Sequence, residues 1–240
     1  MRYLLPDGLW TGVLFLCALP STVQSSIAFT SIARGNVAGT IASAATSNLL
    51  GIGLTPLIIG LMAQTQGGAV SMSGVWRLVE QLLVPFAAGH LLRPWLGAWV
   101  ARNRKLLSLT DRATVVLAVF SAFSAAVIEG IWRQVSLENM LVLVIVNSVL
   151  LTAVLLISRS VARQLGFSKE DEISIVLCGS KKSLVSGVPM ARVLFAPAAV
   201  GAAVLPVMVF HQIQLMACAV IASRYGSRSD AVSEPEAAAR

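Results

Sequence analysis

Long apolar stretches, separated by short polar connections, run along almost the whole chain. Seven of them reach the length of about 20 residues that a membrane-spanning helix needs. They cover residues 8–33, 36–63, 74–99, 112–131, 138–159, 172–194 and 198–222. They lack the period-two alternation of strands, and only helices or closed barrels satisfy backbone groups in lipid. The pattern predicts an all-α, polytopic membrane protein, with a transmembrane bundle of seven segments over residues 1–222.

The sequence changes character after the last apolar stretch. Residues 223–240 are mostly small, polar or charged. A segment of this composition buries too little apolar surface to offset the entropy of ordering it. We therefore expect a polar cytoplasmic tail without stable structure.

Composition and charge narrow the class of protein. Hydrophobic residues make up 56% of the 240 positions and charged residues 12%, whereas a soluble domain carries about 25% charge. The Lys and Arg residues behind the net charge of +7 lie mostly at the ends of apolar runs, with no basic patch typical of nucleic-acid binding. Ten basic residues lie in connections on one side and four on the other. The positive-inside rule then predicts an integral protein of the plasma (inner) membrane with a cytoplasmic C-terminus.

Metal and cofactor chemistry have no support in the sequence. The three cysteines, Cys17, Cys178 and Cys218, all lie in apolar stretches without metal-ligand spacing. We expect no metal, no cofactor and no disulfide framework.

Two of the apolar stretches are interrupted by polar residues and by Pro or Gly. The first contains PSTVQSS, from Pro20 to Ser26, and the second contains GSKKSLVSGVP, from Gly179 to Pro189. Proline removes a backbone donor and clashes with the preceding turn, and freed backbone groups are tolerated at membrane depth only beside protein or water. A pair of interrupted helices in two matching halves is the mark of a secondary transporter built from inverted repeats.

The two halves are unequal. Three apolar segments lie between the 64–73 connection and the second interruption, whereas none precedes the first interrupted segment. If the halves match, three helices belong before the first segment, and the chain is expected to be a fragment of a longer ten-helix protein.

The two interrupted segments also resemble a known family. LPSTVQSSIAFTSIARGN and CGSKKSLVSGVPMA, with FHQIQL further on, resemble the bile acid:sodium symporter family, and its orphan branch in particular. The resemblance covers the chain from Leu5 to Tyr225. It implies inverted repeats of five helices, in which the fourth and ninth helices cross at their unwound midpoints. Residues 8–33 and 172–194 would be these helices.

The resemblance also implies positions for a sodium site. Ser25 and Ser26 occupy positions whose side-chain oxygens bind sodium in coupled members, and Ser43 falls where a fifth-helix hydroxyl is expected. The glutamate of the ninth-helix motif is replaced by Leu177. Its Gln-Asn pair is replaced by Lys181 and Lys182.

The two adjacent lysines are the sharpest signal, because a charge at membrane depth costs at least about 2.5 kcal/mol. A lysine here can stand in for the ion, or it can bind the carboxylate or sulfonate of a substrate. Coupling to Na⁺, coupling to H⁺ and uncoupled exchange all stay open. The candidate substrate or ion ligands are Gln24, Ser25, Ser26, Ser43, Lys181, Lys182, Ser183 and Ser186, with Ser47, Asn48 and Glu129 as further candidates.

The function predicted from these residues is secondary active transport (symport) of small organic anions of the bile-acid type, by alternating access at the crossed helices. Two alternatives remain. One is a membrane regulatory protein without transport activity. The other is an intramembrane hydrolase in which a lysine activates Ser183 or Ser186, although the chain lacks a G-x-S-x-G motif. We expect a transporter rather than an enzyme.

Overall fold

The computed structural model describes residues 5–65, 72–128, 130 and 136–237, and all regular structure in these residues is helical. The helices are α1 (Asp7–Ala18), α2 (Val23–Ile32), α3 (Val37–Thr65), α4 (Met72–Arg102), α5 (Arg104–Ile128), α7 (Leu137–Gln164), α8 (Lys169–Gly179), α9 (Leu184–Leu194) and α10 (Pro197–Ala237).

Among the described residues, three helices are long and apolar enough to cross a membrane: Val37–Met62, Leu137–Gln164 and Ala199–Ser227. Helices α1 and α2 together form a fourth candidate, bent by 61° at the break between them. The chain is therefore a polytopic membrane protein, as the apolar pattern predicted. Helix α4 covers the predicted segment 74–99, and α5 covers residues 112–128 of the predicted segment 112–131. Helices α8 and α9 together cover 172–194 apart from the break between them. The division into seven spans stays a prediction.

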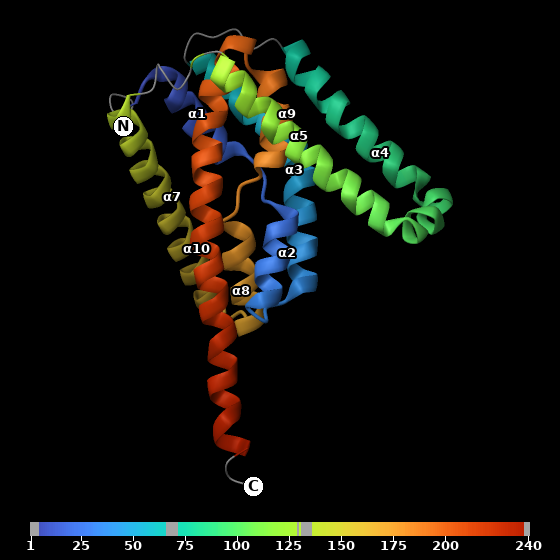
Figure 1. Cartoon of the computed structure of the whole chain (residues 1–240), viewed down its shortest axis with the longest axis vertical. Helices are drawn as coiled ribbons and strands as arrows, with labels where there is room; N and C mark the ends of the chain where they lie inside the picture. Colours follow the sequence, from blue (N-terminus) through green and yellow to red (C-terminus); the bar gives the residue numbers. More distant parts are fainter. Residues whose placement is uncertain (1–4, 66–71, 129, 131–135, 238–240) are drawn as a thin grey trace.

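The broken helices run side by side in opposite directions (Figure 1). Helix α1 leads down into α2, and α8 leads up into α9, with α7 and α10 packed along one side. Helices α4 and α5 form a hairpin that reaches away from this group. The two breaks therefore lie inside the helical group.

Buried apolar side chains fix the upper halves of the broken helices. Phe15 and Leu16 of α1 pack with Val188 of α9 and Phe210 of α10 in one cluster. The ring of Phe15 meets that of Phe195 edge to face, with 5.3 Å between centroids. A Cβ on Gly12 would lie 2.8 Å from the carbonyl oxygen of Ala203, so glycine permits the close approach of α1 and α10.

Polar contacts fix the lower ends. The turn after α2 is tied to α8, because the backbone N–H of Asn36 donates to Glu170 O at 3.0 Å and its side-chain amide donates to Asp171 at 2.8 Å. Arg34 takes a positive φ of 56° in this turn. Hydrogen bonds from Asn36 and Ser168 hold the pKa of Asp171 below its ordinary value. The turn and the start of α8 thus form one unit.

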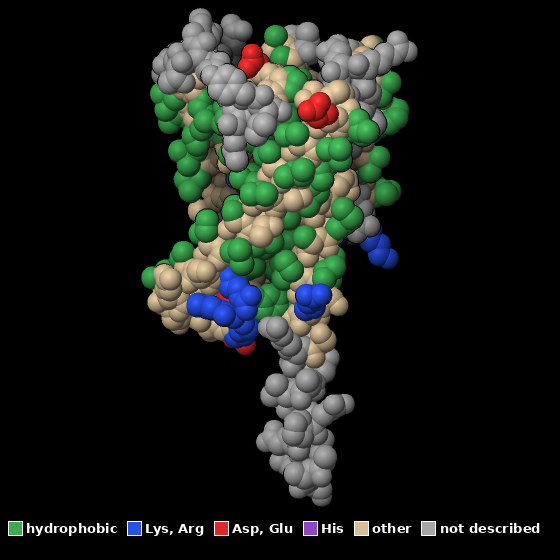
Figure 2. All heavy atoms as spheres, turned by 90° about the vertical axis from the view of Figure 1, so that its left-hand side faces the viewer, with side chains coloured by type: hydrophobic (Ala, Val, Ile, Leu, Met, Phe, Trp, Pro, Cys, Tyr) green, Lys and Arg blue, Asp and Glu red, His purple; other side chains and the backbone are tan. Residues whose placement is uncertain are grey.

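The surface carries the charge pattern of a membrane protein. Figure 2 shows a broad band of apolar side chains, with Lys and Arg gathered below it together with some acidic side chains, and further acidic side chains at the opposite end. Large apolar side chains such as Leu156, Ile157 and Leu141 are more than half exposed. Such a surface is suited to contact with lipid.

The expectation that residues 223–240 lack stable structure is wrong for most of the tail. Helix α10 continues to Ala237. Extending an existing helix needs no new nucleus and adds one hydrogen bond per residue. Alanine and glutamate, which favour helices, recur in this stretch.

Candidate functional site

The first break, Leu19 to Thr22, follows from its proline. Pro20 has no N–H to donate, and its ring pushes the residue before it into an extended conformation. Leu19 accordingly has ψ of 147°, and Thr22 before α2 has ψ of 133°. The second break, Ser180 to Ser183, ends where the Ser183 hydroxyl accepts a hydrogen bond from the N–H of Ser186 and caps α9.

The two breaks bind each other directly. The backbone N–H of Ser183 donates to the carbonyl of Pro20 at 2.9 Å. The hydroxyl of Ser21 donates to the carbonyl of Cys178 at 2.6 Å, and that of Thr22 donates to the carbonyl of Lys182 at 3.3 Å. Backbone groups left without helical hydrogen bonds at one break therefore bind groups of the other break.

Lys182 satisfies two of the freed carbonyls of the first break. Its ammonium donates to Cys17 O and Leu19 O, each at 2.8 Å. A cation bound by backbone carbonyls at an unwound helix is the arrangement in which transporters coordinate Na⁺. Here the cation belongs to a side chain of the opposite helix.

Polar side chains of α3 satisfy neighbouring groups of the same break. The hydroxyl of Thr55 donates to Ala18 O at 2.7 Å. The amide of Asn48 donates to Ser21 O at 2.8 Å, and the hydroxyl of Ser47 accepts from the N–H of Ser21 at 3.0 Å. Every carbonyl from Cys17 to Ser21 thus has a donor, which is what unwound backbone at this depth requires.

Gln214 of α10 holds the second break in place. Its side chain accepts from the backbone N–H of Lys182 at 2.8 Å and donates to the carbonyl of the same residue at 3.0 Å. Its amide nitrogen also lies 2.9 Å from Nδ1 of His211. Gln214 is fully buried, so these bonds are shielded from competing water. They fix the backbone from which the Lys182 side chain reaches α1.

Lys181 lies in a different environment from its neighbour. Its side chain is 1% exposed, and its ammonium is 3.9 Å from the centroid of the Phe29 ring. No hydrogen-bond partner reaches this ammonium in the described part of the chain. A cation over a ring face gains electrostatic stabilisation. The two predicted lysines therefore lie in different environments: Lys182 binds backbone carbonyls, and Lys181 lies over an aromatic ring.

A cavity of about 280 Å³ opens between the two breaks. Its lining includes no Asp or Glu from the described part of the chain, and the lining residues there are Leu19, Ser21, Ser43, Ser47, Ile175, Cys178, Gly179, Lys181 and Lys182. Four of the predicted ligands, Ser43, Ser47, Lys181 and Lys182, thus come together here. The cavity combines basic groups with hydroxyl groups.

The other predicted ligands lie around the cavity rather than on its wall. Gln24 is exposed on α2, Ser25 has a hydroxyl without a hydrogen-bond partner among the described residues, and fully buried Ser26 donates to Thr22 O at 2.5 Å. The hydroxyl of Ser183 donates to that of Ser186 at 3.0 Å.

Two further candidates are Asn48 and Glu129. The hydroxyl of Ser186 donates to Oδ1 of Asn48 at 3.2 Å, so Asn48 links α3 to both breaks. Glu129 lies outside the described residues.

Sequence reasoning missed Ser21, Thr55 and Gln214 as parts of the site. Each is a polar residue within or beside an apolar run, and each is less than 9% exposed. Such residues in a spanning helix indicate a polar partner, but they do not show which backbone group that partner is.

Several known proteins are similar to this chain. The model of the SBF-like CPA transporter family matches residues 1–227. "Uncharacterized protein PA2026" of Pseudomonas aeruginosa is 55% identical over 223 residues, which are 92% of this chain and 67% of the relative. "Putative symporter YfeH" of Escherichia coli K12 is 51% identical over 222 residues, with the same two shares. "Sodium/bile acid cotransporter 7" of Rattus norvegicus is 24% identical over 217 residues, 90% of this chain and 64% of the relative.

Proposed function

Because the chain belongs to the SBF-like CPA transporter family, as the motifs of its broken helices predicted, we propose that it is a secondary transporter of small organic anions. Transport occurs by alternating access at the two broken helices, which are the crossed helices of an inverted-repeat fold. The basic end of the bundle faces the cytoplasm, in keeping with the positive-inside rule.

One observation carries this proposal: the ammonium of Lys182 on α8–α9 is held by the carbonyls of Cys17 and Leu19 on α1. This contact reaches from one broken helix to the other. If the two move relative to each other, the contact must change. A side chain bound in this way can respond to the state of the transporter, as a bound ion does.

The charge of the cavity favours an anionic substrate. Lys181 and Lys182 line it, together with hydroxyls of Ser21, Ser43 and Ser47. The N-termini of α2 and α9 both lie at the breaks, and helix N-termini carry partial positive charge. A carboxylate or sulfonate entering the cavity meets donors and positive charge. The name of the rat relative, a sodium/bile acid cotransporter, supports an organic anion of the bile-acid type.

The position of Lys182 also indicates whether transport needs a coupling ion at this site. Leu177, at the position of the family's glutamate, is fully buried in an apolar cluster and offers no oxygen. The carbonyls of Cys17 and Leu19 already bind an ammonium. We therefore propose that Lys182 is a tethered replacement for the coupling cation at this position, so that transport does not require sodium there.

The hydrolase alternative has no support in the geometry. The hydroxyl groups of Ser183 and Ser186 bind each other and Asn48. The ammonium of Lys182 binds carbonyls, and that of Lys181 lies over a ring. A lysine that activates a serine must be within hydrogen-bond reach of it.

Uptake into proteoliposomes tests the proposal. The purified protein is reconstituted and offered radiolabelled organic anions, with taurocholate among them, at an imposed anion gradient. We expect saturable uptake by the wild type and loss of uptake in Lys182→Met, which keeps the length of the side chain without its charge. Lys105→Met, at an exposed position of α5, is the matched control. Absence of uptake of every anion by the wild type would favour a regulatory protein without transport.

A further inference from the structure

A second hollow lies at the basic end of the bundle, away from the helix breaks. It has a volume of about 280 Å³ and is formed by α7, α8 and α10. Its lining residues are Thr152, Leu155, Leu156, Arg159, Val176, Ile221, Arg224 and Tyr225. We call this hollow the α7–α10 groove. It is apolar at one end and basic at the other.

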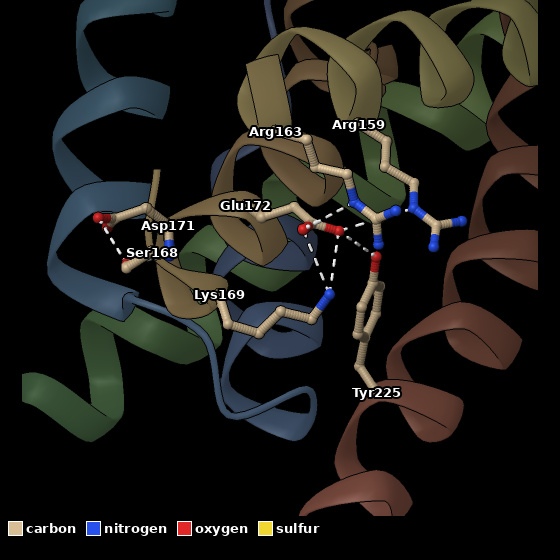
Figure 3. Close-up of polar contacts among 7 residues, drawn as sticks. All are labelled: Arg159, Arg163, Ser168, Lys169, Asp171, Glu172 and Tyr225. Carbon is tan, nitrogen blue, oxygen red and sulfur yellow. Dashed lines mark hydrogen bonds and ion pairs between the residues drawn. The ribbon is translucent and has the colours of Figure 1, made fainter. Parts of the chain in front are cut away.

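The charges beside the groove do not balance. Glu172 is a carboxylate beside the groove that contacts its lining residues Arg159 and Tyr225. Figure 3 shows Arg159, Arg163 and Lys169 converging on Glu172. Its oxygens lie 3.2 Å from Nε of Arg163, 3.2 Å from Nζ of Lys169 and 3.7 Å from Nε of Arg159. The hydroxyl of Tyr225 also donates to it, at 3.2 Å. One negative charge therefore faces three cations.

Asp171 does not correct the imbalance. It binds the hydroxyl of Ser168 and the amide of Asn36, and in Figure 3 it points away from the groove. The groove therefore keeps a net positive charge.

Two guanidinium groups of the groove have binding capacity to spare. The Arg159 side chain is 42% exposed, and its buried Nε forms the 3.7 Å ion pair with Glu172 but no hydrogen bond in the part of the chain that the structure describes. Arg224 enters the groove from α10 and forms none of the ion pairs found among these residues. Guanidinium groups present forked donors that match phosphate oxygens. The basic end of the groove is thus suited to a phosphate group.

The apolar end continues toward the lipid-facing surface. On α7 it runs from Arg159 back to Thr152, which is about 10 Å along a helix. Leu155 and Leu156 of α7 and Ile221 of α10 line this stretch. Leu156 is 58% exposed, and its neighbour Ile157 is 61% exposed. A chain lying here would pass from the basic end onto exposed apolar side chains of α7.

We propose that the α7–α10 groove binds one anionic phospholipid of the cytoplasmic leaflet. The phosphate lies between Arg159 and Arg224, and one acyl chain lies along Leu155, Leu156 and Ile221. Basic pockets between helices on the cytoplasmic side of a membrane protein suit anionic headgroups. A soluble anion would use the basic end only, whereas a phospholipid also covers the apolar end.

Native mass spectrometry of the purified protein tests this site. The protein is mixed with equal amounts of dioleoyl phosphatidylglycerol and dioleoyl phosphatidylcholine. We expect one phosphatidylglycerol to be retained in preference to phosphatidylcholine. Arg224→Gln should weaken the retention about fivefold, the loss expected for one basic contact. Arg104→Gln, at an exposed position outside the groove, is the matched control and should retain the lipid as the wild type does.

Two additions separate a lipid site from a site for soluble anions and from loss of folding. Thr152→Trp fills the apolar end without a change of charge, and it should also reduce phosphatidylglycerol retention. Glycerophosphoglycerol, the headgroup without acyl chains, should not compete at equal concentration. Equal retention of the two lipids by the wild type, unchanged retention by Arg224→Gln, or full competition by the free headgroup would each overturn the proposal. Thermal unfolding of each variant without lipid identifies variants that do not fold.

Discussion

The backbone N–H of Ser183 donates to the carbonyl of Pro20 at 2.9 Å, and this bond joins the two interrupted helices at their breaks. Neither residue could make the bond in an unbroken helix. Pro20 lies in the first break because it cannot continue α1, and Ser183 ends the second break because it caps α9. The two interruptions are therefore one structural unit, and a substitution at either break should alter the structure of the other.

Gly51 of α3 should not tolerate a side chain. A Cβ there would lie 2.7 Å from Cβ of Pro20, and overpacking of this kind costs about 1–3 kcal/mol. We expect Gly51→Ala to lower the thermal unfolding temperature and to reduce uptake, because Pro20 must shift.

Gly53, on the same helix, is the matched control for Gly51. A Cβ at this exposed position meets nothing within 4 Å. Gly53→Ala should leave the unfolding temperature unchanged or raise it, since alanine favours a helix over glycine by about 1 kcal/mol. Equal effects of the two substitutions would mean that contact with Pro20 is not what requires glycine.

Gln214→Leu should destabilise the second break. The substitution leaves the N–H and the carbonyl of Lys182 without their side-chain partner, and each unsatisfied buried group costs about 1–3 kcal/mol. Thermal unfolding measures the loss. Gln212→Leu changes an exposed glutamine of the same helix and should have little effect. A mild Gln214→Leu variant would show that water replaces the side chain.

The hydroxyl of Thr55 should contribute through one hydrogen bond. Thr55→Val removes the donor to Ala18 O and keeps the shape of the side chain. We expect a loss of about 1 kcal/mol in the free energy of unfolding. Thr46→Val, at an exposed position of α3, should be neutral. If Thr46→Val costs as much, the effect belongs to valine in this helix and not to the bond.

Asp171 should make the lower end of the bundle sensitive to acid. Hydrogen bonds from Asn36 and Ser168 hold the pKa of Asp171 below its ordinary value of 3.8 in the folded protein. The ionised form is therefore favoured by folding, and its contribution is present above pH 3.8 and is lost as the pH falls through the lower folded pKa. We expect the stability difference between wild type and Asp171→Ala to shrink as the pH is lowered below 3.8. Thermal unfolding at a series of pH values measures it, and a constant difference would contradict the assignment.

The broken helices could be predicted from sequence because a proline beside a cluster of polar residues interrupts an apolar helix wherever it occurs. The side chains that bind the backbone groups at these breaks could not be predicted from the sequence. Thr55 and Gln214 are distant in sequence from the backbone groups they bind, and only packing brings them together.

The different roles of neighbouring residues also could not be predicted from the sequence. Lys181 and Lys182 are both candidate ligands in the sequence, but residues of a non-helical segment point in different directions. One lysine lies over the ring of Phe29, and the other binds carbonyls of α1. The placement of Ser25 and Ser26 was expected from the family motif. That role stays a prediction, and in the structure Ser26 is buried and donates to Thr22 O of its own chain segment.

Binding of ²²Na⁺ to the purified protein, followed by scintillation proximity, tests the central claim most directly. The ammonium of Lys182 occupies the carbonyls of Cys17 and Leu19, so the wild type should show no saturable sodium binding. Lys182→Ala frees these carbonyls and should allow sodium to bind. Saturable binding by the wild type, with the same affinity as the Lys182→Ala variant, would contradict the role of Lys182 as a tethered replacement for the coupling cation.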